Sequence, residues 1–413
     1  MSFLTSEIKK PLYWGLAWIF TFINFVTFIV SRNEFWLTHP GQAWLAAGAT
    51  EDRTYLASEF ERNMTCYSPL TCFRSGGAFM SQTLIEVITA LSGFISVNVN
   101  SEQETFIILL VGLMWRVACL TLFLICMSRV LESLRSALCV TNCLIFVLGG
   151  LPLWTISKAI VNLPIELEDE TTMRATDAFY FMSFQDLQFY DYGFITIIPL
   201  TMLTLAKIDD IFKMSIKSLF LIGFLTATFY EAFVPIIFLS ALIFSWRTSR
   251  RIKLSLVWLI VGQLVWTVVR AFSIRFTEAS DPESQYFTDT SLFGIFRSST
   301  STGASTKGSL ISILIQLCFI AAVAATTGVV GSLIVAKFRS LPILIEKTLC
   351  AVTTTAFVTT IIIFGSFLRP IYVETGRQSI GLTVAVVMYS FAATQNFLAK
   401  AQAKRSTASS SSV

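Results

Sequence analysis

Acidic side chains at a few positions in the sequence are candidates for chemistry. Glu34 directly follows a long apolar run, in SRNEFW, and Asp52 stands beside Glu51 in GATEDRTY. Asp191 lies between two tyrosines in QDLQFYDYGF, and Glu231 interrupts another long apolar run, in TATFYEAFVPI. A carboxylate can take up a proton or stabilise a developing positive charge, so these residues are candidates for acid–base work.

Structural roles would explain the same carboxylates. Glu34 could pair with Arg32 or end a helix in water. The aromatic residues around Asp191 are also typical of a membrane interface, and Glu231 could simply reach water from a helix end. The sequence leaves both kinds of interpretation open.

Four basic residues are candidates for binding a phosphate group. Arg369 and Arg377 bracket the segment RPIYVETGR before the last apolar run, and Lys158 and Arg270 lie near the ends of two other runs. Arginine grips phosphate with two parallel hydrogen bonds, whereas lysine acts as a point charge. Contact with lipid headgroups is the alternative for each. Arg116 differs, because it falls near the middle of an apolar run, where it must face the protein interior and find a partner or line a polar cavity.

The remaining reactive side chains indicate no metal centre. His39 is the only histidine, which argues against a histidine-based metal site or general base. Cys66 and Cys72, in NMTCYSPLTC, are candidates for a disulfide if their segment lies in an oxidising compartment. Mg²⁺ is compatible with phosphate chemistry, but no ligand motif indicates it, so we predict no cofactor, and we expect no nucleic-acid partner.

The apolar runs that carry these residues predict an all-α polytopic membrane protein. Of the 413 residues, 54% are hydrophobic and 14% are charged, and the mean hydropathy is +0.70. The hydrophobic fraction and the mean hydropathy are higher than those of soluble domains, and the sequence lacks the alternation of apolar and polar residues that is typical of barrel strands. We expect a single transmembrane domain over residues 1–400 with about ten helices, at residues 12–31, 104–128, 136–160, 192–206, 218–230, 232–246, 254–274, 309–335, 342–368 and 380–399.

The charged residues orient these spans. If Lys9 and Lys10 lie in the cytoplasm, ten crossings place 17 of the 30 Lys and Arg residues there, as the positive-inside rule requires. Only five of the 26 acidic residues share that side, and the other 21 gather at the outer face.

The long outer loops are predicted at residues 32–103, 161–191 and 275–308, with an amphipathic helix at residues 81–99 lying on the membrane surface. Residues 401–413 are predicted to form a disordered cytoplasmic tail.

A pair of short helices explains the position of Glu231. Basic linkers precede and follow its apolar run, so the chain must cross and return within residues 218–246. Pro235 then lies in the first turn of the returning helix, where proline is tolerated. Glu231 is expected at the outer end of this hairpin, where it lines a water-accessible cavity or pairs with a cation.

This hairpin resembles the corresponding helix pair of the GT-C glycosyltransferases, multispanning enzymes that use polyprenyl-phosphate-linked sugars. The long first outer loop and the paired arginines of RPIYVETGR are also similar, and the size and span number resemble those of bacterial serotype-converting O-antigen glucosyltransferases. The resemblance implies a GT-C-like fold with a catalytic carboxylate in the first outer loop. Glu34 is the best positional match and Asp52 the runner-up, although Glu34 lacks the adjacent second carboxylate often found in the family.

The expected activity is transfer of a sugar from a polyprenyl-phosphate-linked donor to a glycan or glycolipid acceptor, among membrane lipids at the outer face. Glu231 and Asp191 would line the substrate site, since carboxylates beside aromatic rings suit sugars, and the four basic residues would hold the phosphate. A lipid-linked sugar flippase or transporter, or an O-antigen-type glycan polymerase, is the alternative. Charge within the spans is almost confined to Arg116, which favours the enzyme over a transporter.

The cellular location is the last expectation from the sequence. We expect the bacterial inner membrane, with the active site facing the periplasm. Asn63 begins a glycosylation sequon, Asn-Met-Thr, in the first outer loop. The endoplasmic reticulum membrane, with the site facing the lumen, is therefore the alternative.

Overall fold

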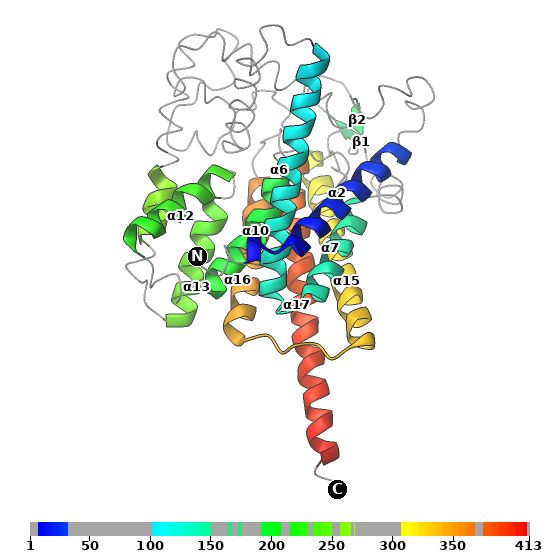
Figure 1. Cartoon of the computed structure of the whole chain (residues 1–413), viewed down its shortest axis with the longest axis vertical. Coiled ribbons are helices and arrows are strands. Elements are labelled where there is room, and N and C mark those ends of the chain that lie inside the picture. Colours follow the sequence, from blue (N-terminus) through cyan, green and yellow to red (C-terminus); the bar gives the residue numbers. More distant parts are fainter. Residues whose placement is uncertain are drawn as a thin grey trace.

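The computed structural model describes residues 7–31, 101–149, 164–166, 172–174, 191–207, 215–229, 234–249, 257–265, 268, 307–367 and 375–410. Within these residues the fold is helical apart from one short pair of strands (Figure 1). The helices are α2 (Pro11–Ser31), α6 (Ser101–Val130), α7 (Leu134–Gly149), α10 (Asp191–Ala206), α12 (Ile216–Phe229), α13 (Val234–Ser249), α15 (Lys307–Phe338), α16 (Glu346–Phe367) and α17 (Thr375–Ser410), with a further helical segment at residues 257–265.

Three of these helices have the length and composition to cross a membrane. Among the described residues, the segments are Leu317–Phe338, Glu346–Phe364 and Ile380–Arg405. Shorter apolar helical segments occur at Leu134–Ile145, Ile195–Ala206 and Ile236–Thr248. A helix satisfies its backbone hydrogen bonds internally, which a chain in hydrocarbon requires. The fold therefore indicates a helical membrane protein, and the ten-helix topology stays a prediction.

The apolar run around Glu231 forms two short helices, as predicted. α12 ends at Phe229, and α13 begins at Val234 with Pro235 in its first turn. The helices have 14 and 16 residues, so each spans only about 21 to 24 Å at 1.5 Å per residue. A hydrocarbon core is about 30 Å thick, so neither helix alone is long enough to cross it upright.

Two features differ from the sequence-based expectation. In the predicted outer loop 161–191, β1 (Pro164–Glu166) pairs antiparallel with β2 (Thr172–Arg174), and three-residue strands are too short to show an alternating pattern. The predicted disordered tail 401–413 was wrong as far as Ser410, because α17 continues to that residue. Serine-rich composition suggested disorder, but the Ala, Lys, Gln and Arg residues at 399–405 are strong helix formers, and extending an existing helix needs no new nucleus.

α17 forms the centre of the bundle and packs against α15, α16, α7 and α10 (Figure 1). Its side chains Val384, Val387 and Phe391 are fully buried. α15 approaches it closely at Gly328, where an added Cβ would lie 2.7 Å from the carbonyl oxygen of Val387. Small residues permit such close contact between membrane helices, so van der Waals packing holds this central pair together.

Candidate functional site

The helices place several predicted outer segments at one end of the bundle. Figure 1 shows α6, α15 and α17 running from the upper part of the view towards its lower part, while α16 runs back. The first residues of the three parallel helices, Ser101, Lys307 and Thr375, therefore share an end. Each follows a segment that was predicted to lie at the outer face, so this end of the bundle is the candidate site.

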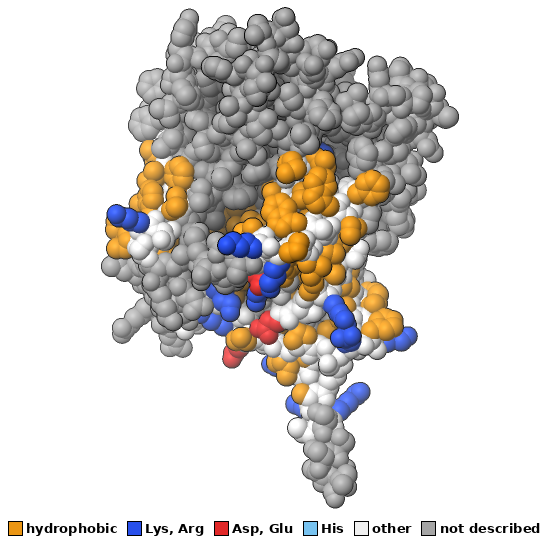
Figure 2. All heavy atoms as spheres, viewed as in Figure 1, with side chains coloured by type: hydrophobic (Ala, Val, Ile, Leu, Met, Phe, Trp, Pro, Cys, Tyr) orange, Lys and Arg blue, Asp and Glu red, His pale blue; other side chains and the backbone are white. Residues whose placement is uncertain are grey.

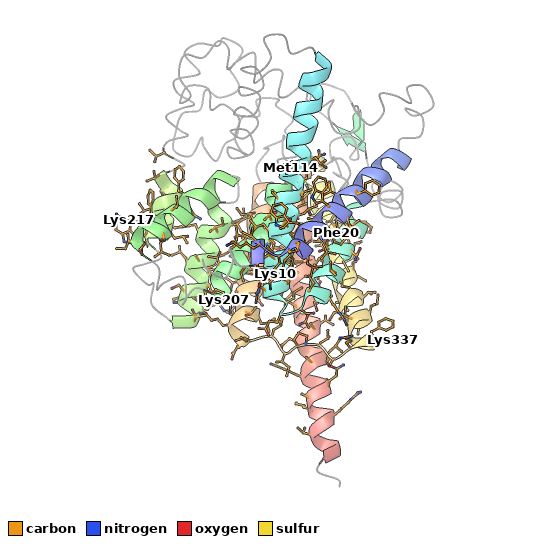
Figure 3. The ribbon with its side chains drawn as sticks, in the orientation of Figure 1. Lys10, Phe20, Met114, Lys207, Lys217 and Lys337 are labelled. Carbon is orange, nitrogen blue, oxygen red and sulfur yellow. The ribbon has the colours of Figure 1, made fainter. Side chains whose placement is uncertain are left out.

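Basic side chains gather towards the opposite end. Figure 3 shows Lys10, Lys207 and Lys337 lower in the view than Phe20 and Met114. Figure 2 shows the same pattern on one face, with a band of apolar side chains above most of the Lys and Arg side chains. Lys217 departs from the pattern, because it lies at the side of the bundle on α12. The separation otherwise agrees with basic linkers on one side of the membrane.

Two predicted site residues lie at the ends of described helices. Asp191 is the first residue of α10, and Lys207, which directly follows α10, lies towards the basic end. Asp191 is therefore at the end of α10 away from the basic linkers. Arg377 lies in the first turn of α17, a helix that packs against α10. The backbone thus places Asp191 and Arg377 towards the same end of two neighbouring helices.

The other predicted site residues lie outside the described residues. They are Glu34, Asp52, Lys158, Glu231, Arg270 and Arg369, together with the disulfide candidates Cys66 and Cys72. Their convergence stays a prediction. Arg116 lies on α6 and is partly buried. A partner was expected for it, and the residue does make a polar or electrostatic contact.

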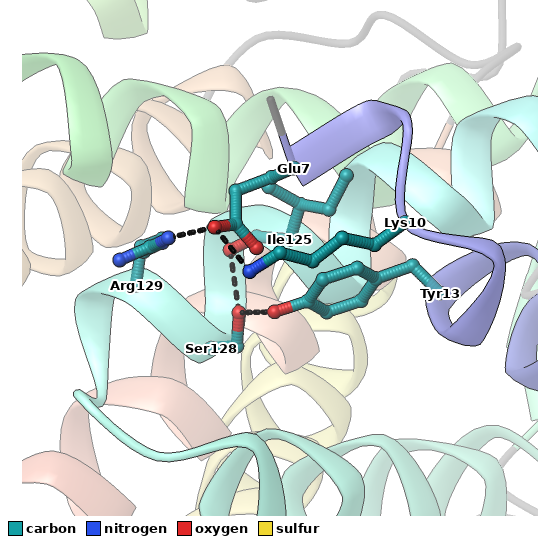
Figure 4. Close-up of polar contacts among 6 residues, drawn as sticks. All are labelled: Glu7, Lys10, Tyr13, Ile125, Ser128 and Arg129. Atoms are coloured by element: carbon teal, nitrogen blue, oxygen red, sulfur yellow. Dashed lines mark hydrogen bonds and ion pairs between the residues drawn. The ribbon is translucent and has the colours of Figure 1, made fainter. Parts of the chain in front are cut away.

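A buried carboxylate at the basic end, Glu7, pairs with two basic side chains, and the sequence analysis did not predict this group. Glu7 is 3% exposed, and its Oε1 accepts a hydrogen bond from Lys10 Nζ at 2.7 Å. The same oxygen accepts a hydrogen bond from the guanidinium of Arg129, at the end of α6 (Figure 4). The hydrogen bond from Lys10 holds the pKa of Glu7 below its usual value, against the opposing effect of burial and with help from the charge of Arg129. Glu7 is thus an ionised structural partner rather than a proton acceptor at neutral pH.

A neighbouring hydrogen-bond chain joins the same two elements. Ser128 Oγ donates to the Ile125 carbonyl oxygen at 2.9 Å, so the hydroxyl of Tyr13 must be the donor to Ser128 Oγ at 3.0 Å. Tyr13 belongs to α2 and Ser128 to α6 (Figure 4). The spacing of Glu7 and Lys10 is visible in the sequence, but the pairing with Arg129 joins residues 122 positions apart and has no local signal.

Hydroxyl groups are buried where α10, α13 and α16 meet. Four buried residues form a small apolar cluster there, namely Leu205 from α10, Ala241 and Phe244 from α13, and Ala351 from α16. One helical turn away along the same helices stand Thr201, Ser240 and Thr355, all buried. Thr201 donates to the carbonyl oxygen four residues before it, at 2.8 Å, whereas Ser240 Oγ and Thr355 Oγ1 have no hydrogen-bond partner in the described part of the chain. The hydroxyl-rich run TTTAFVTT is the sequence signal for this polar interior.

Comparison with known proteins identified no relative of this chain. No family model matches the chain, and no curated protein or solved structure matches it. Among the described residues, no group of three or more His, Cys, Asp or Glu side chains could hold a metal ion.

Proposed function

We propose that this protein is an integral membrane glycosyltransferase. It would move a sugar from a polyprenyl-phosphate donor to a lipid-linked or surface glycan at the outer face of the membrane. The observation that carries the proposal is the distribution of charge along the helices. In the described helices, Asp and Glu occur only within the first four residues, so the carboxylates available for chemistry belong to the helix ends and to the segments between them.

The reaction exchanges one bond at the anomeric carbon of the sugar. The acceptor hydroxyl oxygen attacks this carbon, and the bond to the phosphate oxygen breaks, with its electron pair leaving on the polyprenyl phosphate. Glu34, or Asp52 in its place, takes the hydroxyl proton or stabilises positive charge on the ring. Arg369 and Arg377 hold the departing phosphate through paired hydrogen bonds.

The remaining candidates bind the substrate without reacting. Lys158 and Arg270 add positive charge near the phosphate, and Asp191 and Glu231 accept hydrogen bonds from sugar hydroxyls. Asp191 and Arg377 lie towards the same end of neighbouring helices, which supports their assignment to one site. The proposed location is a bacterial inner membrane, with the site facing the periplasm.

The test is transfer of radiolabelled glucose from polyprenyl-phosphate glucose in membranes that contain the protein. We expect Glu34→Gln or Asp52→Asn to lower the transfer rate by about 100-fold or more, the usual size of a general-base contribution. Glu346→Gln is the matched control, because Glu346 is exposed at the start of α16, at the opposite end of the bundle. Full activity in both outer-loop variants would overturn the proposed mechanism.

A lipid-linked sugar flippase is the second candidate, and the buried hydroxyl groups favour it. Transporter sites usually lie near the bilayer midplane, and Ser240 and Thr355 offer buried hydroxyls inside the apolar helical segments Ile236–Thr248 and Glu346–Phe364 that a sugar headgroup could use. A flippase would move the labelled lipid between leaflets without forming a new glycosidic bond. Movement of polyprenyl-phosphate glucose in vesicles that lack any acceptor, together with no transfer product when acceptor is present, would decide for this candidate.

A further inference from the structure

α17 extends beyond the packed bundle at its C-terminal end (Figure 1). Among the described side chains of this helix, Ala399 is the last that is buried, and Lys400, Lys404 and Arg405 are all exposed. The candidate membrane span on this helix, Ile380–Arg405, carries all three basic residues in its last six positions. These basic residues therefore stand where the helix leaves the hydrocarbon.

The linker between α15 and α16 lies against the same part of α17. Gln395 of α17 is fully buried and donates from Nε2 to the Pro342 carbonyl oxygen at 3.1 Å. Leu341 and Leu344 of the linker point into the protein, whereas Ile343 and Ile345 are exposed. A segment with one apolar side buried and another facing outwards is typical of chain that lies in the membrane interface.

Exposed aromatic residues mark the level of that interface. Phe338 is 76% exposed and stands between Lys337 and Arg339, and Phe397 is 71% exposed and lies one turn before Lys400. Phe397, Lys400 and Lys404 share one face of α17, because they are three and seven residues apart. Apolar rings followed directly by basic groups fit the boundary between acyl chains and headgroups.

Five exposed basic residues at this level, which we call the basic collar, are Lys337, Arg339, Lys400, Lys404 and Arg405. None of them forms an ion pair with any residue in the part of the chain that the structure describes. At 1.5 Å per residue, Arg405 lies only about 12 Å beyond Phe397 along the helix. This distance is no larger than the headgroup layer together with a Debye length of about 10 Å. All five charges therefore lie close enough to a charged membrane surface to be attracted by it.

We propose that the basic collar binds the phosphates of anionic phospholipids in the leaflet at this end of the bundle, with Phe338 and Phe397 inserted at the acyl boundary. The ammonium and guanidinium groups recognise headgroup charge, and no headgroup shape is selected. The site is independent of the proposed sugar transfer, because it lies at the opposite end of the helices. It requires only that α15, α16 and α17 cross the membrane.

The experiment uses the full-length protein in phosphatidylcholine bilayers with a trace of spin-labelled lipid. Electron paramagnetic resonance gives the fraction of labelled lipid immobilised on the protein, once for phosphatidylglycerol and once for phosphatidylcholine. We expect a preference for phosphatidylglycerol that falls at least about fivefold in the variant Lys400→Gln/Lys404→Gln/Arg405→Gln, since the loss of a single Lys or Arg near the surface already accounts for about that factor. The same preference should disappear in 1 M salt, where the Debye length is about 3 Å.

Two further variants make the outcome specific. Lys337→Gln/Arg339→Gln removes the two collar charges at the C-terminal end of α15 and leaves α17 unchanged, and it should also weaken the preference. Lys217→Gln/Arg247→Gln removes two exposed charges from α12 and α13, outside the collar, and should lower the preference less than either collar variant does. Equal immobilisation of the two lipids by the wild-type protein, or an unchanged preference in both collar variants, would overturn the proposal.

Discussion

Glu7 shows how a single side chain joins the N-terminal segment to the bundle. Its carboxylate receives hydrogen bonds from Lys10 on its own segment and from Arg129 at the end of α6. The pKa of Glu7 is lowered from its ordinary value of 4.5, so the folded protein favours the ionised form. A group with a lowered pKa contributes stability that is present above its unfolded value and is lost as the pH falls through its folded value.

We therefore expect Glu7→Gln to destabilise the protein at pH 7 by up to about 1 kcal/mol. The effect is small because Lys10 and Arg129 are each about half exposed, and solvent screens their attraction. Thermal unfolding in detergent at pH 7 and at a pH well below 4.5 measures it, with Glu346→Gln as the control. The difference between Glu7→Gln and the wild type should shrink in acid, and an equal difference at both pH values would contradict the role assigned to Glu7.

Two glycines hold α12 against the helical segment 257–265. An added Cβ at Gly262 would lie 2.2 Å from the carbonyl oxygen of Phe220, and one at Gly223 would lie 2.0 Å from that of Leu259. Both distances are far below van der Waals contact with a backbone atom, which cannot move aside as a flexible side chain can. Only glycine permits this crossing, which fixes α12 beside the segment and so positions the predicted turn that carries Glu231.

Gly262→Ala should destabilise the protein by about 1 to 3 kcal/mol, the usual cost of overpacking. Gly15→Ala is the matched control, because an added Cβ at Gly15 meets nothing within 4 Å and alanine is the better helix former. The measurement is the unfolding temperature of both variants in the same detergent, which should fall for Gly262→Ala and not for Gly15→Ala. If the two substitutions change the unfolding temperature alike, the close crossing of the two helices is not present.

Hydropathy predicted the positions of the described helices because an apolar run of 15 to 20 residues is a strong local signal. It placed α10 at residues 192–206, and the helix begins one residue earlier. The contacts between Gly223 and Leu259 and between Glu7 and Arg129 join residues far apart in the sequence. A hydropathy reading covers only short stretches of sequence, so it could not predict these contacts. At the candidate site, the sequence suggested Asp191 and Arg377 for one surface, and it gave no sign that Ser240 and Thr355 would be buried with their hydroxyls unpartnered among the described residues.

The molecule as a whole has two chemically different ends. One end carries Glu7 with its cations and the basic collar. The other end receives the chain at the first residues of α6 and α15, which follow segments with more acidic than basic residues. A lipid-linked substrate could reach a site at the acidic end from within the bilayer. The proposed enzyme therefore needs its catalytic and hairpin carboxylates on the same membrane face, away from the collar.

Cysteine accessibility tests this arrangement most directly. Single cysteines are introduced as Glu34→Cys, Glu231→Cys and Lys404→Cys on a background whose native cysteines are replaced, and sealed vesicles of known orientation are treated with a membrane-impermeant maleimide. We predict that residues 34 and 231 react from one face and residue 404 only from the other. Reaction of residues 34 and 231 from opposite faces would contradict the shared outer site.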